Sequence, residues 1–133
     1  MEKLKGSCLC GAISYEVAGR PRASFLCQCR TCQKLSGSGH AAEFVVPEKR
    51  LTITGILRSY EMECDDGNSS TSHFCPTCGS PMLKRSTLLP DAVFIHAASL
   101  DDPSSFKPQQ VFWHASAQPW DVVDHNLEIR DAV

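Results

Sequence analysis

The sequence has no long hydrophobic segment and no strong excess of charge. No apolar run approaches the ~18 residues of a membrane-spanning helix, and residues 1–6 are not followed by the apolar segment of a signal peptide. The net charge is −2, and no run of lysine and arginine offsets it. We therefore expect a cytoplasmic protein that contacts neither membranes nor nucleic acids.

Internal repeats, long amphipathic helices and linker-like stretches are also missing. The 133 residues suffice for one domain with a single core. Hydrophobic residues make up 42% of the chain and charged residues 21%, which is a globular and not a disordered composition. The sequence therefore predicts a single domain that spans residues 1–133.

Short segments of alternating hydrophobicity, separated by glycine and proline, predict a mainly β fold. One helical turn over residues 33–37, ended by glycine, is the only helical feature that we expect. Residues 64–70 are polar and predict an exposed hairpin loop, and residues 121–133 form an acidic tail. The predicted strands cover residues 12–17, 23–26, 41–46, 51–55, 57–62, 72–74, 82–84, 92–96 and 110–114.

Cysteine, in contrast, is abundant: the chain has eight. Disulfides are rare in the cytoplasm, so clustered cysteines there favour metal binding. Cys8 and Cys10 lie two residues apart in an extended segment and therefore present their sulfurs to one face. Cys75 and Cys78 belong to a CPxCG turn, which is typical of half of a four-thiolate zinc site. These motifs together predict a closed zinc site at Cys8, Cys10, Cys75 and Cys78, which would stabilise a small core.

The cluster of Cys27, Cys29 and Cys32 has two interpretations. It is either an open site, with three thiolates and one exchangeable position, or a closed site completed by Cys64. We favour the open site, because Cys64 lies in an acidic loop that lacks the CPxCG pattern of a metal-binding turn, and a lone cysteine is more often a free thiol than a ligand. An iron–sulfur cluster is a lesser alternative, since it would need a fourth cysteine nearby. The histidines have no ligand spacing to the cluster; they are His40, His73, His96, His114 and His125.

The order CxCG, CxCxxC and FCPxCG resembles the glutathione-dependent formaldehyde-activating enzyme family, which includes centromere protein V-like proteins. The resemblance covers nearly the whole chain and is carried by residues 6–17, 27–37 and 74–81, with Phe112-Trp113 and Pro119-Trp120 near the end. It implies a zinc-stapled Mss4-like fold, also called a β-tent. It also implies two Zn²⁺, one closed and one open, at the two cysteine groups. This chain is shorter than the founding enzyme, and Cys64 lies outside the shared pattern.

The activity that the resemblance implies is the condensation of glutathione with formaldehyde to S-hydroxymethylglutathione, a carbon–sulfur lyase reaction run in reverse. Our hypothesis is that the glutathione thiol takes the open position of a catalytic zinc held by Cys27, Cys29 and Cys32, where it loses its proton. The alternative is a non-catalytic zinc-binding module that binds a protein partner. The carboxylates of glutathione need positive side chains nearby, and the candidates are Arg20, Arg22, Arg30, Lys34 and Arg50. Trp113 and Trp120 are candidates for the walls of the pocket. Each of these residues is more often an ordinary surface or core residue.

Overall fold

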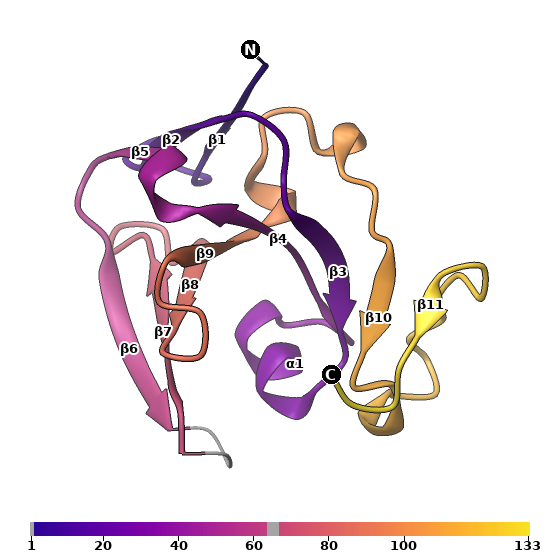
Figure 1. Cartoon of the computed structure of the whole chain (residues 1–133). Helices are drawn as coiled ribbons and strands as arrows, with labels where there is room; N and C mark the ends of the chain where they lie inside the picture. Colours follow the sequence, from indigo (N-terminus) through magenta and orange to yellow (C-terminus); the bar gives the residue numbers. More distant parts are fainter. Residues whose placement is uncertain (1, 64–66) are drawn as a thin grey trace.

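The computed structural model describes residues 2–63 and 67–133, and these residues form two β-sheets (Figure 1). The smaller sheet has three antiparallel strands in the order β1-β2-β5, and the larger has eight in the order β11-β10-β3-β4-β9-β8-β7-β6. Within the larger sheet, β10 pairs in parallel with β3 and β11, and the other pairs are antiparallel. The fold is therefore mainly β, as the sequence predicts.

The strands are short, and one α-helix interrupts them. The helix, α1, spans Arg30–Ser36, and Figure 1 shows it below β4, between β3 on one side and β7 and β8 on the other. The strand bounds are β1 Lys3–Ser7, β2 Ser14–Ala18, β3 Ala23–Cys27, β4 Ala41–Pro47, β5 Leu51–Thr54, β6 Arg58–Glu63, β7 Ser69–Phe74, β8 Pro81–Ser86, β9 Ala92–His96, β10 Gln110–Phe112 and β11 Glu128–Ile129. Four 3₁₀ helices connect them: η1 Glu48–Arg50, η2 Ala97–Ser99, η3 Pro103–Ser105 and η4 His114–Ser116. Among the described residues, no helix is long and apolar enough to span a membrane.

The predicted strands all occur, with three differences at their ends and connections. The helical turn expected at residues 33–37 is the longer α1, and Gly37 ends it in the left-handed conformation with φ 73°. The segments expected on either side of Gly55 belong to different sheets, β5 to the smaller and β6 to the larger. The strand expected to reach His114 stops at Phe112, because Trp113 adopts φ 58°.

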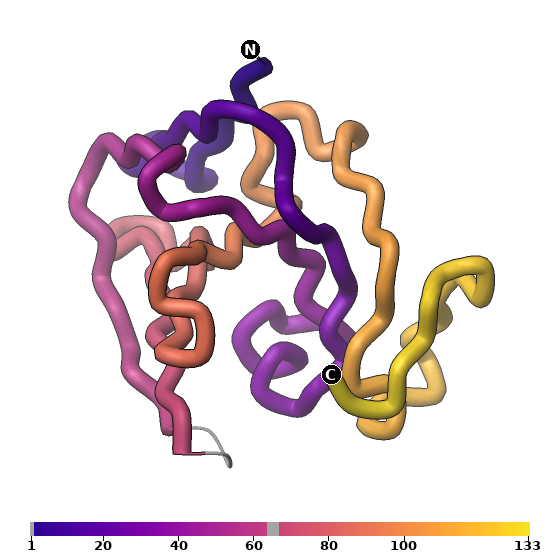
Figure 2. The backbone as a smooth tube through the Cα atoms, in the orientation of Figure 1, coloured from indigo at the N-terminus to yellow at the C-terminus, as the bar shows by residue number. Residues whose placement is uncertain are grey.

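The first strand and the chain's last segment were not expected from the sequence. β1 contains Lys3, Lys5 and Gly6, and pairing with β2 overrides their low β-propensity. The expected acidic tail contains β11 and is held to the body of the protein, where Trp113 N–H donates to the carbonyl of Ala132 at 2.9 Å. Figure 2 shows this segment returning beside the end of β10. Of the expected hairpin loop, residues 64–66 lie outside the described residues, while β7 already begins at Ser69.

Side-chain alternation divides the core between the two faces of the larger sheet. Phe44 and Val46 of β4 lie on the face toward the smaller sheet, where they pack in one cluster with Tyr15 and Val17 of β2. Ala41 and Val45 point to the other face and belong to a second cluster. That second cluster also contains Phe25, Cys27, Cys32 and Ala92, so the three-cysteine group lies in the layer between the larger sheet and α1.

Gly6 allows the smaller sheet to approach η2 closely. A Cβ atom at this position would collide with the phenol ring of Tyr15 and lie 2.6 Å from the carbonyl oxygen of Ser99. We expect Gly6→Ala to lower the free energy of unfolding by about 1–3 kcal/mol, because overpacking forces the backbone apart. Chemical denaturation measures this, and Lys5→Ala, which loses one exposed ion pair with Glu16, should change stability by under about 0.5 kcal/mol.

Candidate metal centres

The first cysteine group joins two tight turns that lie far apart in the sequence. Cys8 and Cys10 follow β1, and Cys75 and Cys78 lie between β7 and β8. Their four Sγ atoms lie within 4.8 Å of one another, and Cys10 Sγ is 3.7 Å from Cys75 Sγ. The four-thiol group predicted from CxC and CPxCG is therefore assembled, although 65 residues separate Cys10 from Cys75.

Backbone N–H groups in both turns point at sulfur atoms. Ile13 N–H donates to Cys8 Sγ at 3.3 Å, and Cys78 N–H donates to Cys75 Sγ at 3.5 Å. The Ser80 hydroxyl lies 3.1 Å from Cys78 Sγ, and this hydrogen bond lowers the pKa of Cys78 to about 5. Hydrogen bonds of this kind favour thiolates over thiols, which is the ligand form that zinc binds.

The second cysteine group is built by the start of α1. Cys27 ends β3, Cys29 is the N-cap of α1, and Cys32 lies in its first turn. Cys32 N–H donates to Cys29 Sγ at 3.2 Å, so one sulfur takes the place that a serine or aspartate oxygen fills at most helix starts. The three Sγ atoms lie within 4.8 Å of one another.

Because the three sulfurs lie close together, the pKa values of the thiols differ strongly from one another. The contact between Cys27 and Cys29 lowers the pKa of Cys29 to about 2 and raises that of Cys27 to about 12. Cys27 and Cys32 are buried and Cys29 is half-buried, so charge on this group needs a positive partner. A divalent cation is the partner that three converging thiols fit best.

The seven clustered cysteines thus form the two groups that the sequence predicts. Among the described residues, no histidine joins either group, and none of these cysteines forms a disulfide. Cys64 lies outside the described residues, so its role as a fourth ligand stays an open alternative.

A buried ion pair lies beside the three-cysteine group, on the same face of the larger sheet. Cys27 pairs with Ala41, and Glu43, two residues further along β4, pairs with His96 of β9. Lys84 of β8 pairs with Phe94, two residues before His96. Strand alternation therefore brings Glu43, Lys84 and His96 to the face that carries the thiols.

Lys84 connects the carboxylate to the thiols. Its Nζ lies 3.2 Å from Glu43 Oε1, 4.0 Å from Cys32 Sγ and 5.4 Å from the centroid of the Phe94 ring. Burial alone lowers the pKa of Lys84, but the charges of Glu43 and Cys32 outweigh burial, so the pKa is raised. The ammonium stays protonated at neutral pH and offsets negative charge on the thiols.

Two buried polar atoms on this face have no hydrogen-bond partner among the described residues. They are Glu43 Oε2 and His96 Nε2. Burial lowers the pKa of His96 below its ordinary value, so its imidazole is neutral at physiological pH. Unsatisfied buried groups cost free energy, and they concentrate where a ligand, water or ion is handled.

Gln28, between Cys27 and Cys29, anchors the three-cysteine loop to the C-terminal part of the chain. The side chain is fully buried, donates from Nε2 to Asp121 Oδ2 at 2.9 Å, and accepts at Oε1 from His114 Nδ1 at 2.7 Å. Asp121 Oδ2 also accepts from His40 Nδ1 at 2.9 Å. The loop is therefore held by His114 and Asp121, which lie 86 and 93 residues further along the chain.

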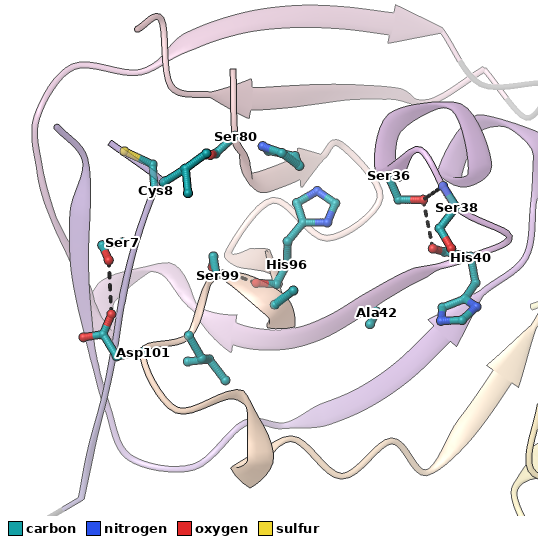
Figure 3. Close-up of a pocket in the computed structure, with 14 residues that line it drawn as sticks. Ser7, Cys8, Ser36, Ser38, His40, Ala42, Ser80, His96, Ser99 and Asp101 are labelled. Carbon is teal, nitrogen blue, oxygen red and sulfur yellow. Dashed lines mark hydrogen bonds between the residues drawn. The ribbon is translucent and has the colours of Figure 1, made fainter. Parts of the chain in front are cut away.

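A cavity of about 470 Å³ lies between the end of α1 and the four-cysteine group. Figure 3 shows His96 in its middle, with Cys8 and Ser80 on one side and Ser36, Ser38 and His40 on the other. Ser36 lies one helical turn after Cys32 and thus on the same face of α1. The helix that carries Cys32 therefore contributes to the cavity wall through Ser36, although none of the three clustered cysteines lines the cavity. Hydroxyl and imidazole groups dominate its polar lining.

The cations and tryptophans expected around the site are not gathered in this cavity. Arg20 and Arg50 line a separate hollow with Glu2 and Gly19. The exposed remainder consists of Arg22, Arg30, Lys34, Trp113 and Trp120, none of which lines the cavity.

Sequence reasoning missed Glu43 and Lys84, and it considered His96 only as a metal ligand. One signal was available, because Glu43 interrupts the apolar run AAEFVVP that forms β4, and a charge inside a buried strand needs a partner. Nothing in the sequence identified Lys84 as that partner.

Comparison with known proteins agrees with this architecture. The model of the glutathione-dependent formaldehyde-activating enzyme family matches residues 3–116. This chain belongs to that family. A protein of Halomonas elongata, named "Putative glutathione-dependent formaldehyde-activating enzyme", is 29% identical over 113 residues, which cover 81% of this chain and 72% of the relative.

A crystal structure of a Rhodobacter sphaeroides protein has the same fold. Its TM-score is 0.58 and its sequence identity 22%, over 73% of this chain and 87% of the other. The solved structure therefore supports the β architecture in which the cysteines of this chain converge.

The two cysteine groups should respond differently to loss of one ligand. We expect Cys78→Ser to leave little folded protein, because a structural zinc site contributes about 10–16 kcal/mol to a small domain. Cys32→Ser should keep its circular dichroism spectrum while bound zinc falls from two ions per chain to one. Metal analysis of both purified variants measures this, and two zinc ions in Cys32→Ser would contradict the assignment. Cys64→Ser is the control for the closed alternative, since loss of one zinc there would make Cys64 a ligand.

Replacing Gln28 should destabilise the protein, because two partly buried side chains each lose a hydrogen-bond partner. Gln28→Leu removes the donor of Asp121 and the acceptor of His114 at nearly unchanged volume. We expect the free energy of unfolding to fall by about 1–3 kcal/mol. Urea denaturation measures this, and Gln110→Leu, which loses only an exposed bond to Glu128, should change stability far less.

Proposed function

We propose that this protein condenses glutathione with formaldehyde to S-hydroxymethylglutathione at a zinc ion held by Cys27, Cys29 and Cys32. The observation that carries the proposal is the ligand number: three thiols converge, and among the described residues no fourth ligand joins them. Zinc with three protein ligands keeps one position for an exchangeable group, as catalytic zinc does. Membership of the family supports the choice of substrates.

The four-cysteine group has a structural role in this proposal. A second zinc ion at Cys8, Cys10, Cys75 and Cys78 would have no exchangeable position, since four thiolates complete its tetrahedron. The whole chain, residues 1–133, acts as one domain, and the reaction takes place in the cytoplasm without a membrane or nucleic-acid partner.

A zinc ion held by the three thiolates would act as a Lewis acid, which lowers the pKa of a bound substrate thiol so that it loses its proton near neutral pH. The chain's own residues orient and enclose the reactants. α1 fixes Cys29 and Cys32, and Phe25 packs against Phe94 and Phe112 in the cluster that contains Cys27. The serine hydroxyls of the cavity offer hydrogen bonds to a peptide-like substrate.

The covalent step is an addition without redox change. The thiolate sulfur gives an electron pair to the carbonyl carbon, the S–C bond forms, and the π pair moves to oxygen. That oxygen takes one proton, which replaces the proton that the thiol released. The reverse reaction breaks the S–C bond, which makes the protein formally a carbon–sulfur lyase.

A non-catalytic zinc-binding module for a protein partner is the alternative. Exposed Trp120 and Val122, 67% and 86% exposed, favour it, because large apolar side chains on a surface often mark contacts. The two functions differ at the second metal: an enzyme binds a small thiol there, and a module does not.

Cobalt substitution tests this difference, because the spectrum of cobalt reports its ligands. Glutathione titrated into the cobalt-loaded protein should raise the sulfur-to-cobalt charge-transfer band, since a thiolate competes well for an open position on a soft-ligand site. S-Methylglutathione, which has no thiol, should leave the band unchanged. Cys32→Ser should abolish the response, and an unchanged wild-type spectrum at millimolar glutathione would refute the glutathione reaction for this protein.

A further inference from the structure

We propose that Lys84 is a catalytic residue of this reaction, whose ammonium group binds the oxygen of the aldehyde and of the hydroxymethyl adduct. The inference rests on the proposed function, and it adds a group that neither cysteine motif contains. It follows from the position of Lys84, the hydrogen bonds that its ammonium leaves unused, and the carboxylate that holds it.

The position of Lys84 is beside the reacting atoms. Its Nζ lies 4.0 Å from Cys32 Sγ, on the sheet face that carries the thiols. A substrate that approaches these thiols from the side of Cys32 would therefore meet the ammonium group. The side chain is 17% exposed, so it is accessible from outside without being solvated like a surface lysine.

The ammonium group has hydrogen-bonding capacity to spare. It carries three donors, and Glu43 Oε1 accepts one at 3.2 Å. The Cys32 sulfur is a distant second acceptor, and no other acceptor for Nζ is found among the described residues. At least one N–H is therefore free to bind an oxygen atom.

Glu43 argues against a role limited to charge balance. A divalent ion on three thiolates retains one negative charge, which the Lys84 ammonium would cancel and the Glu43 carboxylate would restore. A lysine needed only for neutralisation gains nothing from this partner. The carboxylate does fix the position of the ammonium group, as a group that must meet a substrate atom requires.

The cost of this arrangement points the same way. Glu43 is fully buried, and none of the described residues donates a hydrogen bond to its Oε2. Buried ion pairs with unsatisfied atoms contribute little to stability and are often less favourable than apolar side chains of similar volume. The pair at Glu43 and Lys84 is thus better explained by chemistry than by folding.

The chemistry needs a positive group at this place. When the thiolate adds to formaldehyde, negative charge develops on the carbonyl oxygen. A fixed ammonium group within hydrogen-bond distance stabilises this oxygen more in the transition state than in the neutral aldehyde, and such interactions raise kcat. Lys84 keeps its proton throughout, and the oxygen takes its proton from water.

The main test is Lys84→Met in the zinc-loaded full-length protein. We expect kcat to fall about 100-fold, with two zinc ions retained and the KM for glutathione changed by less than about threefold. Arg85→Met is the matched control, because it removes the same charge from the next residue, which pairs with Glu48 and not with the site. It should leave kcat unchanged. A normal kcat in Lys84→Met overturns the proposal, and so does loss of the second zinc, which would show a role in metal binding alone.

Two further measurements keep the result unambiguous. The double variant Lys84→Met/Glu43→Leu removes both buried charges, so it should fold at least as well as Lys84→Met and show the same loss of kcat; recovery of kcat would overturn the proposal. The cobalt-loaded Lys84→Met protein should still bind glutathione. Absence of that binding in the wild type refutes the proposed function, whereas binding in both proteins with equal kcat refutes only the role of Lys84.

Equilibrium binding provides a readout that does not depend on turnover. S-(2-Hydroxyethyl)glutathione carries a hydroxyl group near the position of the adduct oxygen, and S-ethylglutathione lacks it. Calorimetry should give the hydroxyl ligand about tenfold higher affinity in the wild type, as expected for a hydrogen bond to a charged group. Lys84→Met should abolish this preference, and Lys84→Arg should restore part of it. A preference that survives in Lys84→Met overturns the proposal.

Discussion

The meeting of Cys8 and Cys10 with Cys75 and Cys78 is the constraint on which the rest of the structure depends. The first pair follows β1 of the smaller sheet, and the second lies between two strands of the larger sheet. Their convergence ties the two layers together at one edge. The core between the layers is small, and a shared metal would replace the apolar contacts that so short a chain cannot supply.

The same constraint shapes the cavity. Cys8 and Ser80 belong to the four-cysteine turns and also line the cavity, while Ser36 reaches it from the helix that carries Cys32. One wall thus comes from the four-cysteine turns, and the other comes from the helix that carries Cys32.

The layer between α1 and the larger sheet contains buried polar residues that are unfavourable for stability. Glu43, Lys84 and His96 occupy positions on a sheet face that apolar residues would fill more favourably. The three thiols beside them carry strongly separated proton affinities. This cost falls on the sheet face that carries the three thiols, whereas the opposite face of the sheet is apolar around Phe44 and Ile95.

The sequence by itself determined the mainly β class, the positions of most strands and the membership of both cysteine groups. The strands follow from local features, namely alternation and the glycine and proline at turns. The four-cysteine group joins distant residues, but its two halves are recognisable separately, and zinc's need for four ligands pairs them. The assignment of β5 and β6 to different sheets, the fixed C-terminal segment and the Glu43–Lys84 pair were decided only by the tertiary structure. Each joins residues far apart in the chain, and whether a lysine such as Lys84 or an arginine such as Arg20 reaches the site depends on strand register and on the order of strands. A single sequence does not encode those in any local pattern.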